Sequence, residues 1–588
     1  MHQRVLRVAL LTALGVLAVF ALFDAATLHG HFEIRYVGAR EVPNNELVFY
    51  LWYAVWGGVA VACFAAAFHA TIAARLVEWF RACARAPRHV VLFASLLVFL
   101  GALLFRHTVL LNEPICDDEL VYQFTARNLC LGHVTAPPPI PADFLKNQFV
   151  IVDAQRWHGK YPLGHSLLLA PFEMLGRPDL LGPIIAALSL ALTYAIALRF
   201  VSSTVATLSV MLLACSPHFV WTHATLVSQT SSGLLMLAAV FASMRFRETR
   251  RDRWLFTIGA ALGFGILTRP MPGVLVAAAV VAAQLQAAVQ EETAENARTR
   301  FFKRAARELA FIALAALPFI GVVLWTNHVQ SGSASSTAYI EVHAKFGMFE
   351  NRDGELTNSV GGALVRENAW LFGWPFSLLF VAFARIERAR AYFWMLVGTT
   401  IAYRLIVPKT VVATTGPIYV AESVPFLCIA SAAGMAHVAA LLRRLGDRRA
   451  TQRVAAFVTA AFLVALLAFP RVELPPIHAG ARLRAQVKDL LAQRKVERAV
   501  VFSGIIVNMD YAGTWASYPP NPWPDLRDDL LFLRIPGTPD GVRRAKALWQ
   551  ERFSDRPAFI WDARKGVQGL EPLDSAVVEQ LTEYSTVR

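Results

Sequence analysis

Residues 89–111 read HVVLFASLLVFLGALLFRHTVLL and are followed at once by the segment 112–122, NEPICDDELVY. The first stretch is apolar for long enough to cross about 30 Å of hydrocarbon as a helix. The second contains three consecutive carboxylates, Asp117, Asp118 and Glu119. We therefore expect a membrane-spanning helix with an acidic turn just beyond its end.

Apolar runs of similar length recur from the N-terminus to about Pro470. The 588-residue chain is 56% hydrophobic and 17% charged, whereas about a quarter of the residues in a soluble protein are charged. The sequence therefore predicts an all-α polytopic membrane protein with about thirteen spanning helices. These spans are expected near 4–23, 47–74, 89–111, 180–199, 203–216, 225–244, 255–268, 272–288, 308–326, 370–384, 391–407, 417–441 and 454–470.

The net charge of +14 arises from short clusters of basic residues between the apolar runs. With the N-terminus inside, thirteen spans place every cluster on the cytoplasmic side, as the positive-inside rule requires. The same assignment places the long loops 112–179 and 327–369 outside. The clusters lack interleaved aromatic residues, so we expect no nucleic-acid partner. They are Arg75 to Arg88, Arg245 to Arg253, Arg298 to Arg307, Arg385 to Arg390 and Arg443 to Arg453.

The span pattern divides the chain into three parts. Residues 1–88 form a hairpin of two spans; the length of the first favours an uncleaved anchor over a cleaved signal peptide. Residues 89–470 form the membrane core, and residues 471–588 form a small α/β domain on the outer side. This domain has no glycine-rich phosphate loop, so we expect no nucleotide site there. Its elements are expected to be helices at 480–493 and 541–552 and strands at 497–502, 530–534 and 557–561.

The first outer loop contains two short helices and two cysteines. Residues 119–131 read as a helix, and residues 165–175 read as an apolar helix too short to span, which we place in the membrane interface. Cys116 and Cys130 lie 14 positions apart in a compartment that permits disulfides. A bridge and two unpaired thiols are both compatible with the sequence, because it does not show their geometry.

Five short motifs occur in order along residues 89–470. They are Asp118-Glu119 with Tyr122, Lys160-Tyr161-Pro162, Thr268-Arg269-Pro270, Phe372-Gly373-Trp374-Pro375, and Gly416-Pro417-Ile418-Tyr419 with Glu422. In motif order and topology, the chain resembles the membrane glycosyltransferases with the GT-C fold. It is similar in particular to the group of protein O-mannosyltransferases and aminoarabinose transferases to lipid A. The resemblance implies the GT-C fold, a polyprenyl-phosphate-linked sugar as donor, and an active site on the outer face.

The chain departs from this family in two places. Family members often carry a second acidic residue in the outer loop after the next pair of spans, where this chain has His218 and His223 in the segment 216–223. An arginine often follows the Gly-Pro of the late motif, and Ile418 stands there instead. The contacts to the donor phosphate and to the acceptor are therefore not carried over from the family.

The acidic turn supplies the candidate catalytic residues. Transfer of a sugar from a phosphate to a hydroxyl passes through an oxocarbenium-like transition state, and a general base must remove the proton of the hydroxyl. We assign this role to Asp118, with Asp117 as the alternative, while Glu119 positions Asp118 or binds the acceptor. Tyr122 matches the family residue three positions after the acidic pair and is expected to bind substrate. Without the resemblance, all of the acids would read as a solvated helix cap.

Cations are needed opposite the base, because the leaving group is a phosphate monoester. Lys160, His165 and Arg269 are the candidates. Each also has a structural alternative: Lys160 an exposed loop residue, His165 a buried or solvated histidine, and Arg269 the end of a short helix. Glu422 lies in an apolar stretch, where an ionisable side chain usually faces a cavity. We therefore expect Glu422 to bind substrate. The histidine spacing does not require zinc, so we expect no metal and no other cofactor.

The sequence therefore predicts an inverting hexosyl- or pentosyltransferase in the membrane, with a lipid, a glycan or a protein as acceptor. The excess of arginine over lysine and the abundance of alanine suggest a bacterial inner membrane with the active site facing the periplasm. A secondary transporter would also explain the many spans, the helix break at 268–272 and Glu422, but not the long acidic loop. A polysaccharide polymerase or ligase is a second alternative, although such enzymes place their largest loop late in the chain.

Overall fold

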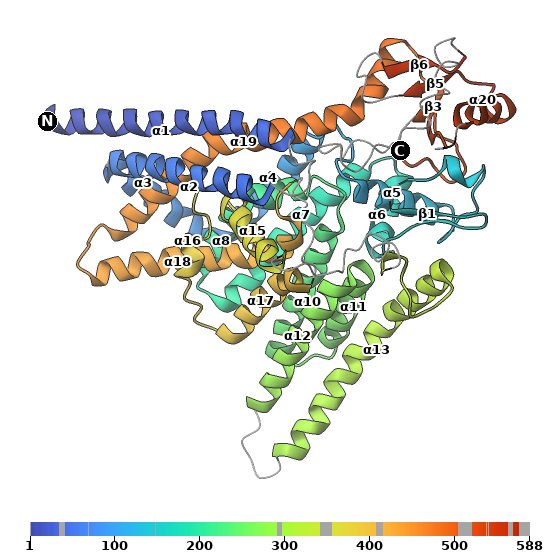
Figure 1. Ribbon diagram of the computed structural model, residues 1–588. Helices are drawn as coiled ribbons and strands as arrows, with labels where there is room; N and C mark the ends of the chain where they lie inside the picture. The colour runs from blue at the N-terminus through green and yellow to red at the C-terminus, as the bar shows by residue number, and fades with distance from the viewer. Residues whose placement is uncertain are drawn as a thin grey trace.

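The computed structural model describes residues 2–34, 42–68, 70–147, 149–290, 297–340, 355–406, 415–503, 520–536, 538, 540–561 and 569–574. The described chain is a bundle of helices with two small sheets, and the larger sheet lies at one end of the bundle (Figure 1). Within these described ranges, eight helices are long and apolar enough to cross a membrane. The protein is an integral membrane protein, and the number of thirteen spans stays a prediction. The eight are α1 (His2–Ile34), α2 (Val42–Ala67), α4 (Pro87–Thr108), α7 (Leu181–Phe200), α12 (Pro270–Gln290), α13 (Ala297–Ser331), α18 (Val424–Arg444) and α19 (Ala450–Gln493).

Shorter helices complete the bundle. Helices α8 (Ser203–Ala214) and α11 (Arg253–Thr268) are apolar but have only 12 and 16 residues, as their short runs predicted. Helix α10 (Ser228–Thr249) is long enough to span, yet it begins with five polar residues that are all buried. The remaining helices of the bundle are α3 (Ala70–Arg85), α9 (Pro217–Thr222), α15 (Glu355–Trp370), α16 (Leu379–Ala382) and α17 (Arg390–Ile406).

The N-terminal helices dock on the turn that follows α15. The Tyr53 hydroxyl donates a 2.6 Å hydrogen bond to the carbonyl of Gly373. A Cβ atom on Gly57 would lie 2.3 Å from the Pro375 ring, so only glycine lets α2 approach this closely. The expected span at 47–74 was too long, because α2 ends at Ala67 and residues 70–85 form the separate, amphipathic helix α3.

The expected span at 370–384 was wrong. Helix α15 ends at Trp370, and the chain then turns at Gly373, whose φ of +69° suits glycine. The Ser377 hydroxyl accepts hydrogen bonds from the backbone N–H groups of Phe372 and Trp374, which stabilises this turn. Between this turn and α17, only the four residues of α16 are helical. Part of the expected outer loop 327–369, namely 341–354, lies outside the described residues.

The first outer loop folds into a compact layer. It contains α5 (Asp117–Cys130), α6 (Gly164–Met174), two single turns, η1 (Ala142–Phe144) and η2 (Pro178–Leu180), and the antiparallel hairpin of β1 (Val150–Val152) and β2 (Trp157–Gly159). Both short helices that the sequence predicted are present, each with bounds within two residues of the expected ones. The β-hairpin was not predicted, since each of its strands has only three residues.

The C-terminal segment contains a four-stranded sheet in the order β4-β3-β5-β6. Strand β3 (Ala499–Ser503) pairs in parallel with β4 (Leu530–Arg534) and β5 (Ala558–Trp561), while β6 (Leu570–Pro572) is antiparallel to β5. Helix α20 (Gly541–Arg552) packs beside the sheet, so the predicted elements from 497 to 561 are confirmed. Helix α19 runs through position 470 without a break as far as Gln493. That residues 471–588 form a separate domain on the outer side stays a prediction.

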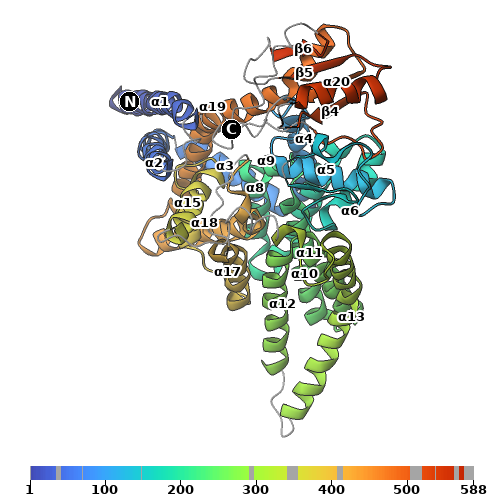
Figure 2. The ribbon, with the colours of Figure 1, turned by 45° about the vertical axis from the view of Figure 1, so that its right-hand side comes forward.

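The sheet and the first outer loop share one hydrophobic core. Both views show the sheet and α20, in red, lying next to α5 and α6, in cyan (Figures 1 and 2). Buried side chains from the loop, such as Phe144, pack with side chains from the sheet, such as Phe502, at 6.3 Å between ring centroids. The two segments are therefore packed as one layer, although more than three hundred residues separate them in the sequence.

Candidate active site

The three acids form the first turn of α5, with Cys116 as the residue before the helix. Carboxylates are stabilised there by the helix dipole. Cys116 and Cys130 lie at opposite ends of the 14-residue helix, about 21 Å apart along its axis. A disulfide needs Cα atoms closer than about 7 Å, so no bridge can form. Both thiols are free, and the alternative of unpaired cysteines is correct.

Glu119 is fully enclosed and its two oxygens are occupied. Oε2 accepts from Arg106 at 3.1 Å and from the Leu226 N–H at 2.9 Å, while Oε1 accepts from the Ile115 N–H at 3.0 Å. None of its surface is exposed. These contacts tie the acidic turn to α4 and to the segment before α10. Of the two roles expected for Glu119, they fit positioning and leave no oxygen for an acceptor.

Asp117 is buried and paired with a cation from the C-terminal segment. Its Oδ1 lies 2.9 Å from Nη2 of Arg484 in α19. Burial raises the pKa of Asp117 to about 6, and the charge of Arg484 opposes this rise. A carboxylate held in this way is less available to an incoming hydroxyl than an exposed one.

Asp118 is the half-buried acid of the three, and its Oδ1 accepts a 2.5 Å hydrogen bond from the Tyr161 hydroxyl. Burial, followed by the charge of Asp118, raises the pKa of Tyr161, so the phenol stays protonated and acts as the donor. Tyr161 also stacks on Tyr122, with 4.7 Å between ring centroids. Tyr161 belongs to a quoted motif but was not predicted as a site residue.

Tyr122 and His165 are both anchored on the start of α10. The Tyr122 hydroxyl is 2.7 Å from the Ser228 hydroxyl, and Nδ1 of His165 is 2.8 Å from the Ser231 hydroxyl. Nε2 of His165 donates to the Leu226 carbonyl at 2.8 Å, so Nδ1 must accept. Burial lowers the pKa of His165 to about 4. His165 is therefore uncharged, which fits its structural alternative and not a cation facing a phosphate.

Residues 228–232, Ser-Gln-Thr-Ser-Ser, were missed by the sequence analysis. They are buried at the start of an otherwise apolar helix, and their side chains contact the acidic loop on one side and cavities on the other. The signal was present, because polar residues inside a membrane bundle usually face a cavity or a partner.

Lys160 lies directly after β2 and is only 2% exposed, so the alternative of an exposed loop residue was wrong. Its Nζ lies 3.0 Å from the centroid of the Phe149 ring and 4.7 Å from that of Tyr161. Such cation–π contacts stabilise a buried ammonium group. Burial lowers the pKa of Lys160 to about 7, although the charges of Asp118 and Asp117 oppose the shift. Lys160 is therefore a cation below about pH 7, and it lies on the side of the acidic turn.

Arg269 and Glu422 form a buried ion pair. Arg269 ends α11, as its alternative proposed, and its guanidinium lies 6.0 Å from the Tyr419 ring. Glu422 lies in the 3-10 turn η3 (Ile418–Ser423) immediately before α18, where the sequence predicted a regular span. Arg269 therefore both ends α11 and forms an ion pair with Glu422.

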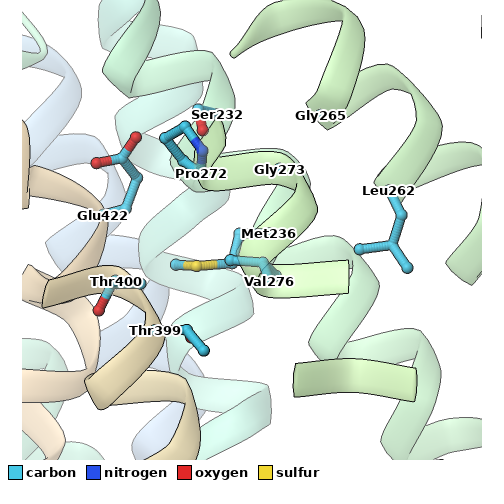
Figure 3. A pocket seen from close by; sticks show the side chains of 10 residues that line it. All are labelled: Ser232, Met236, Leu262, Gly265, Pro272, Gly273, Val276, Thr399, Thr400 and Glu422. Atoms are coloured by element: carbon cyan, nitrogen blue, oxygen red, sulfur yellow. The ribbon is translucent and has the colours of Figure 1, made fainter. Parts of the chain in front are cut away.

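Two cavities meet at Glu422. One is lined by residues of α10, α11, α12 and α17, both apolar and polar, and Figure 3 shows the Glu422 carboxylate beside Ser232 and Pro272 at its edge. The other is lined by His218, His223 and Gln229 as well as Glu422. His218 forms a buried pair with Glu367, 2.8 Å between Nδ1 and Oε2, which the sequence did not predict. Glu422 thus faces cavities, as expected.

The acidic turn and the Arg269–Glu422 pair both lie near the stacked rings of Tyr122 and Tyr161. Burial raises the pKa of Tyr122, the charge of Asp118 raises it further, and the charge of Arg269 lowers it. A Cβ atom on Gly164 would lie 2.6 Å from the backbone nitrogen of Thr268, so α6 begins against the end of α11. The structure therefore brings Asp118, Lys160 and Arg269 around one aromatic pair.

Within the described part of the chain, no group of three or more His, Cys, Asp or Glu side chains is placed to hold a metal ion. Independence from metals and other cofactors stays a prediction.

Comparison with known proteins supports the fold. The family model described as dolichyl-phosphate-mannose-protein mannosyltransferase matches residues 179–325. The chain is similar to the crystal structure of ArnT from Cupriavidus metallidurans bound to undecaprenyl phosphate, with a TM-score of 0.50, 15% identity, and coverage of 81% of this chain and 93% of that chain. The apo state of the same protein gives a TM-score of 0.49, 15% identity, and coverage of 82% and 94%.

A more distant likeness extends to the oligosaccharyltransferase AglB from Archaeoglobus fulgidus in complex with an inhibitory peptide and a dolichol-phosphate. Its TM-score is 0.39, with 11% identity and coverage of 81% of this chain and 69% of that chain. No curated protein matches the sequence. The family model includes the Thr268-Arg269-Pro270 motif, and the ArnT likeness supports the expected fold. The chain thus has the GT-C fold and resembles the group of membrane glycosyltransferases that contains the protein mannosyltransferases and ArnT.

Proposed function

We propose that the protein is a membrane glycosyltransferase that moves a sugar from a polyprenyl phosphate to a hydroxyl group of an acceptor. The observation that carries this proposal is the placement of a half-buried carboxylate, Asp118, and two buried cations, Lys160 and Arg269, around the stacked rings of Tyr122 and Tyr161. This arrangement provides a base for a hydroxyl and positive charge for a phosphate. The family name and the undecaprenyl phosphate in the ArnT structure support a lipid-linked donor.

In the proposed reaction, Asp118 accepts the proton of the acceptor hydroxyl while the hydroxyl oxygen bonds to the anomeric carbon of the sugar. The bond from that carbon to the phosphate oxygen breaks, and its electron pair leaves with the polyprenyl phosphate. The developing charge is stabilised by Lys160 and Arg269. Because the acceptor attacks directly, the anomeric configuration inverts. Asp118 suits this role better than Asp117, since Asp117 is bound to Arg484.

We infer that the reaction takes place on the outer face of a bacterial inner membrane, with a hexose or a pentose as the sugar. The basic clusters between spans support this orientation, because they belong on the cytoplasmic side. The acceptor is a lipid, a glycan or a protein of the envelope. The Arg106–Glu119 pair joins the acidic turn that contains Asp118 to the end of α4, where a lipid-linked donor would be within reach.

The proposal is tested with the purified protein in lipid nanodiscs. The donors are undecaprenyl-phosphate mannose, undecaprenyl-phosphate glucose and undecaprenyl-phosphate aminoarabinose, and the acceptor source is a detergent-solubilised envelope extract that retains its lipids. Release of undecaprenyl phosphate and labelling of an envelope component from one of these donors are expected. Mass spectrometry of envelope glycolipids and glycans, with and without the protein in cells, identifies the acceptor. No consumption of any donor and no change in the envelope would contradict the proposal.

One observation also favours a secondary transporter. The chain breaks between α11 and α12, and the buried pair of Arg269 and Glu422 lies at this break, as in substrate sites of transporters. A transporter would not depend on Asp118, which lies outside the bundle in the loop layer. Solute uptake into proteoliposomes that survives Asp118→Asn, together with absence of sugar transfer, would favour the transporter.

A further inference from the structure

Helix α19 continues past the membrane core and runs beside the acidic loop. Its residues 481, 484 and 488 lie on one face, because they are spaced by three and four positions. We propose that the segment after residue 470 completes the active site, and that Arg484 is a positioning residue which holds Asp117 so that Asp118 alone serves as the base. This inference rests on the proposed function.

Several polar side chains of α19 contact the beginning of the first outer loop. His478 contacts the carbonyl of Val109 at 2.9 Å between Nδ1 and the oxygen. Arg484 pairs with Asp117 at 2.9 Å, and Lys488 lies 2.5 Å from Oε1 of Glu113. Ala481, on the same face, is fully buried among Ile115 and other apolar side chains of the loop. The loop is therefore held along its length from residue 109 to residue 117.

The far part of the segment holds the other end of α5. The Asn521 side chain donates to the Leu120 carbonyl at 3.2 Å and accepts from Asn147 at 2.8 Å. Its backbone carbonyl accepts from Arg127 at 2.9 Å. Asn521 is 4% exposed, so these contacts are shielded from water. Both ends of the helix that begins with the catalytic turn are thus fixed by residues after 470.

Charge explains why Arg484 matters for the division of roles between two adjacent acids. Asp117 faces Arg484 from α19, Asp118 from its own helix and Lys160 from the loop after β2. Burial and the charge of Asp118 favour its neutral form, whereas Arg484 and Lys160 favour the carboxylate. Without Arg484, Asp117 is free to turn toward Asp118 and to take up a proton near neutral pH. The turn would then contain two equivalent acids instead of one oriented base.

The test compares Arg484→Gln with Arg482→Gln, a neighbour on the exposed face of α19. Transfer is measured in nanodiscs across pH with whichever of the three undecaprenyl-phosphate donors the wild-type protein accepts. We expect Arg484→Gln to lower kcat/KM at least about tenfold at pH 7 and to move the acidic limb of the pH profile upward. Arg484→Lys should restore most of the rate, and Arg482→Gln should match the wild-type protein.

A double variant separates positioning from folding. If Arg484 acts through Asp117, then Arg484→Gln in an Asp117→Asn background should cause no further loss and no pH shift. If the single variant Arg484→Gln does not fold, the double variant should recover thermal stability, because it leaves no unpaired carboxylate at position 117. Such a recovery would support the pairing of Arg484 with Asp117. Equal rates and pH profiles for Arg484→Gln and Arg482→Gln would overturn the inference, as would losses that multiply in the double variant. If neither the wild-type protein nor Arg482→Gln transfers sugar from any of the donors, this result would instead contradict the proposed glycosyltransferase function.

Discussion

The hydroxyl of Tyr161 donates a 2.5 Å hydrogen bond to Oδ1 of Asp118, and the Tyr161 ring stacks on Tyr122. Asp118 is therefore oriented by a neutral donor, which fixes the carboxylate without removing its charge. In contrast, Asp117 is bound by Arg484 and Glu119 by Arg106. The three neighbouring acids thus have three different environments, and these decide which of them can accept a proton.

Removing the Tyr161 hydroxyl should weaken catalysis without unfolding the protein. Tyr161→Phe keeps the ring and its stacking but releases Asp118, so we expect kcat to fall by about ten- to a hundredfold. Tyr194→Phe is the control, because its hydroxyl lies on α7 and only approaches Ser203 at 3.5 Å. The sugar-transfer assay checks this prediction. Equal kcat values for the two variants would exclude an orienting role for Tyr161.

Lys160 should produce a basic limb in the pH profile. Its pKa is lowered to about 7, so the rate of the free enzyme, measured as kcat/KM, should fall as pH rises through this value and the ammonium is lost. In Lys160→Arg the cation persists at high pH, and this limb should disappear. Lys160→Met should lose most of the activity at every pH.

The Lys160 amine should also make the free energy of unfolding depend on pH. Between the lowered pKa of about 7 and the ordinary value of 10.5, the unfolded chain binds a proton on Lys160 that the folded protein does not bind. The free energy of unfolding should therefore rise with pH across this window, and Lys160→Met should flatten the rise. Thermal unfolding in nanodiscs at several pH values measures the slope. An identical slope in the variant would contradict a buried, deprotonating Lys160.

Breaking the Arg269–Glu422 pair should destabilise the protein more than removing both charges. Glu422→Gln leaves a buried guanidinium without its carboxylate, at a cost of about 3 kcal/mol. The double variant Arg269→Met/Glu422→Gln should unfold at a higher temperature than Glu422→Gln but should transfer no sugar. Added undecaprenyl phosphate should stabilise Glu422→Gln more than the double variant, because only the former retains the Arg269 guanidinium. Equal stabilisation of both would place the phosphate away from Arg269.

All six cysteines should react as free thiols. Alkylation of the denatured protein without reductant, followed by mass spectrometry, should modify every cysteine, including Cys116 and Cys130 at the two ends of α5. A Cys116–Cys130 disulfide in this experiment would show that α5 does not extend over residues 117–130.

Local patterns in the sequence predicted much of the architecture. Apolar runs identified most of the spanning helices, and the acidic pair with Tyr122 identified the loop that carries the proposed base. The C-terminal strands and α20 were also predicted, since their alternation and apolar composition are local signals. The turn at Gly373 was mistaken for part of a span because its aromatic neighbours are as apolar as a membrane helix.

The remainder depends on contacts between distant parts of the chain. Arg484 and Asp117 are 367 positions apart, and Arg269 and Glu422 are 153 positions apart. No periodicity connects such pairs, so the sequence did not predict that Arg484 pairs with Asp117 or that Arg269 pairs with Glu422. The burial of Lys160, for which an exposed loop residue was the structural alternative, could not be predicted because the β1–β2 hairpin before it has strands of only three residues.

The most direct measurement compares Asp118→Asn with Asp117→Asn in the sugar-transfer assay. Asp118→Asn should reduce kcat by about a hundred- to ten-thousandfold while the thermal unfolding temperature stays near that of the wild-type protein, because the amide cannot accept the proton. Asp117→Asn should retain a clearly larger share of activity, since Asp117 is engaged by Arg484. A folded Asp118→Asn protein that transfers sugar at a rate within about tenfold of the wild-type rate would contradict the assignment of Asp118 as the base.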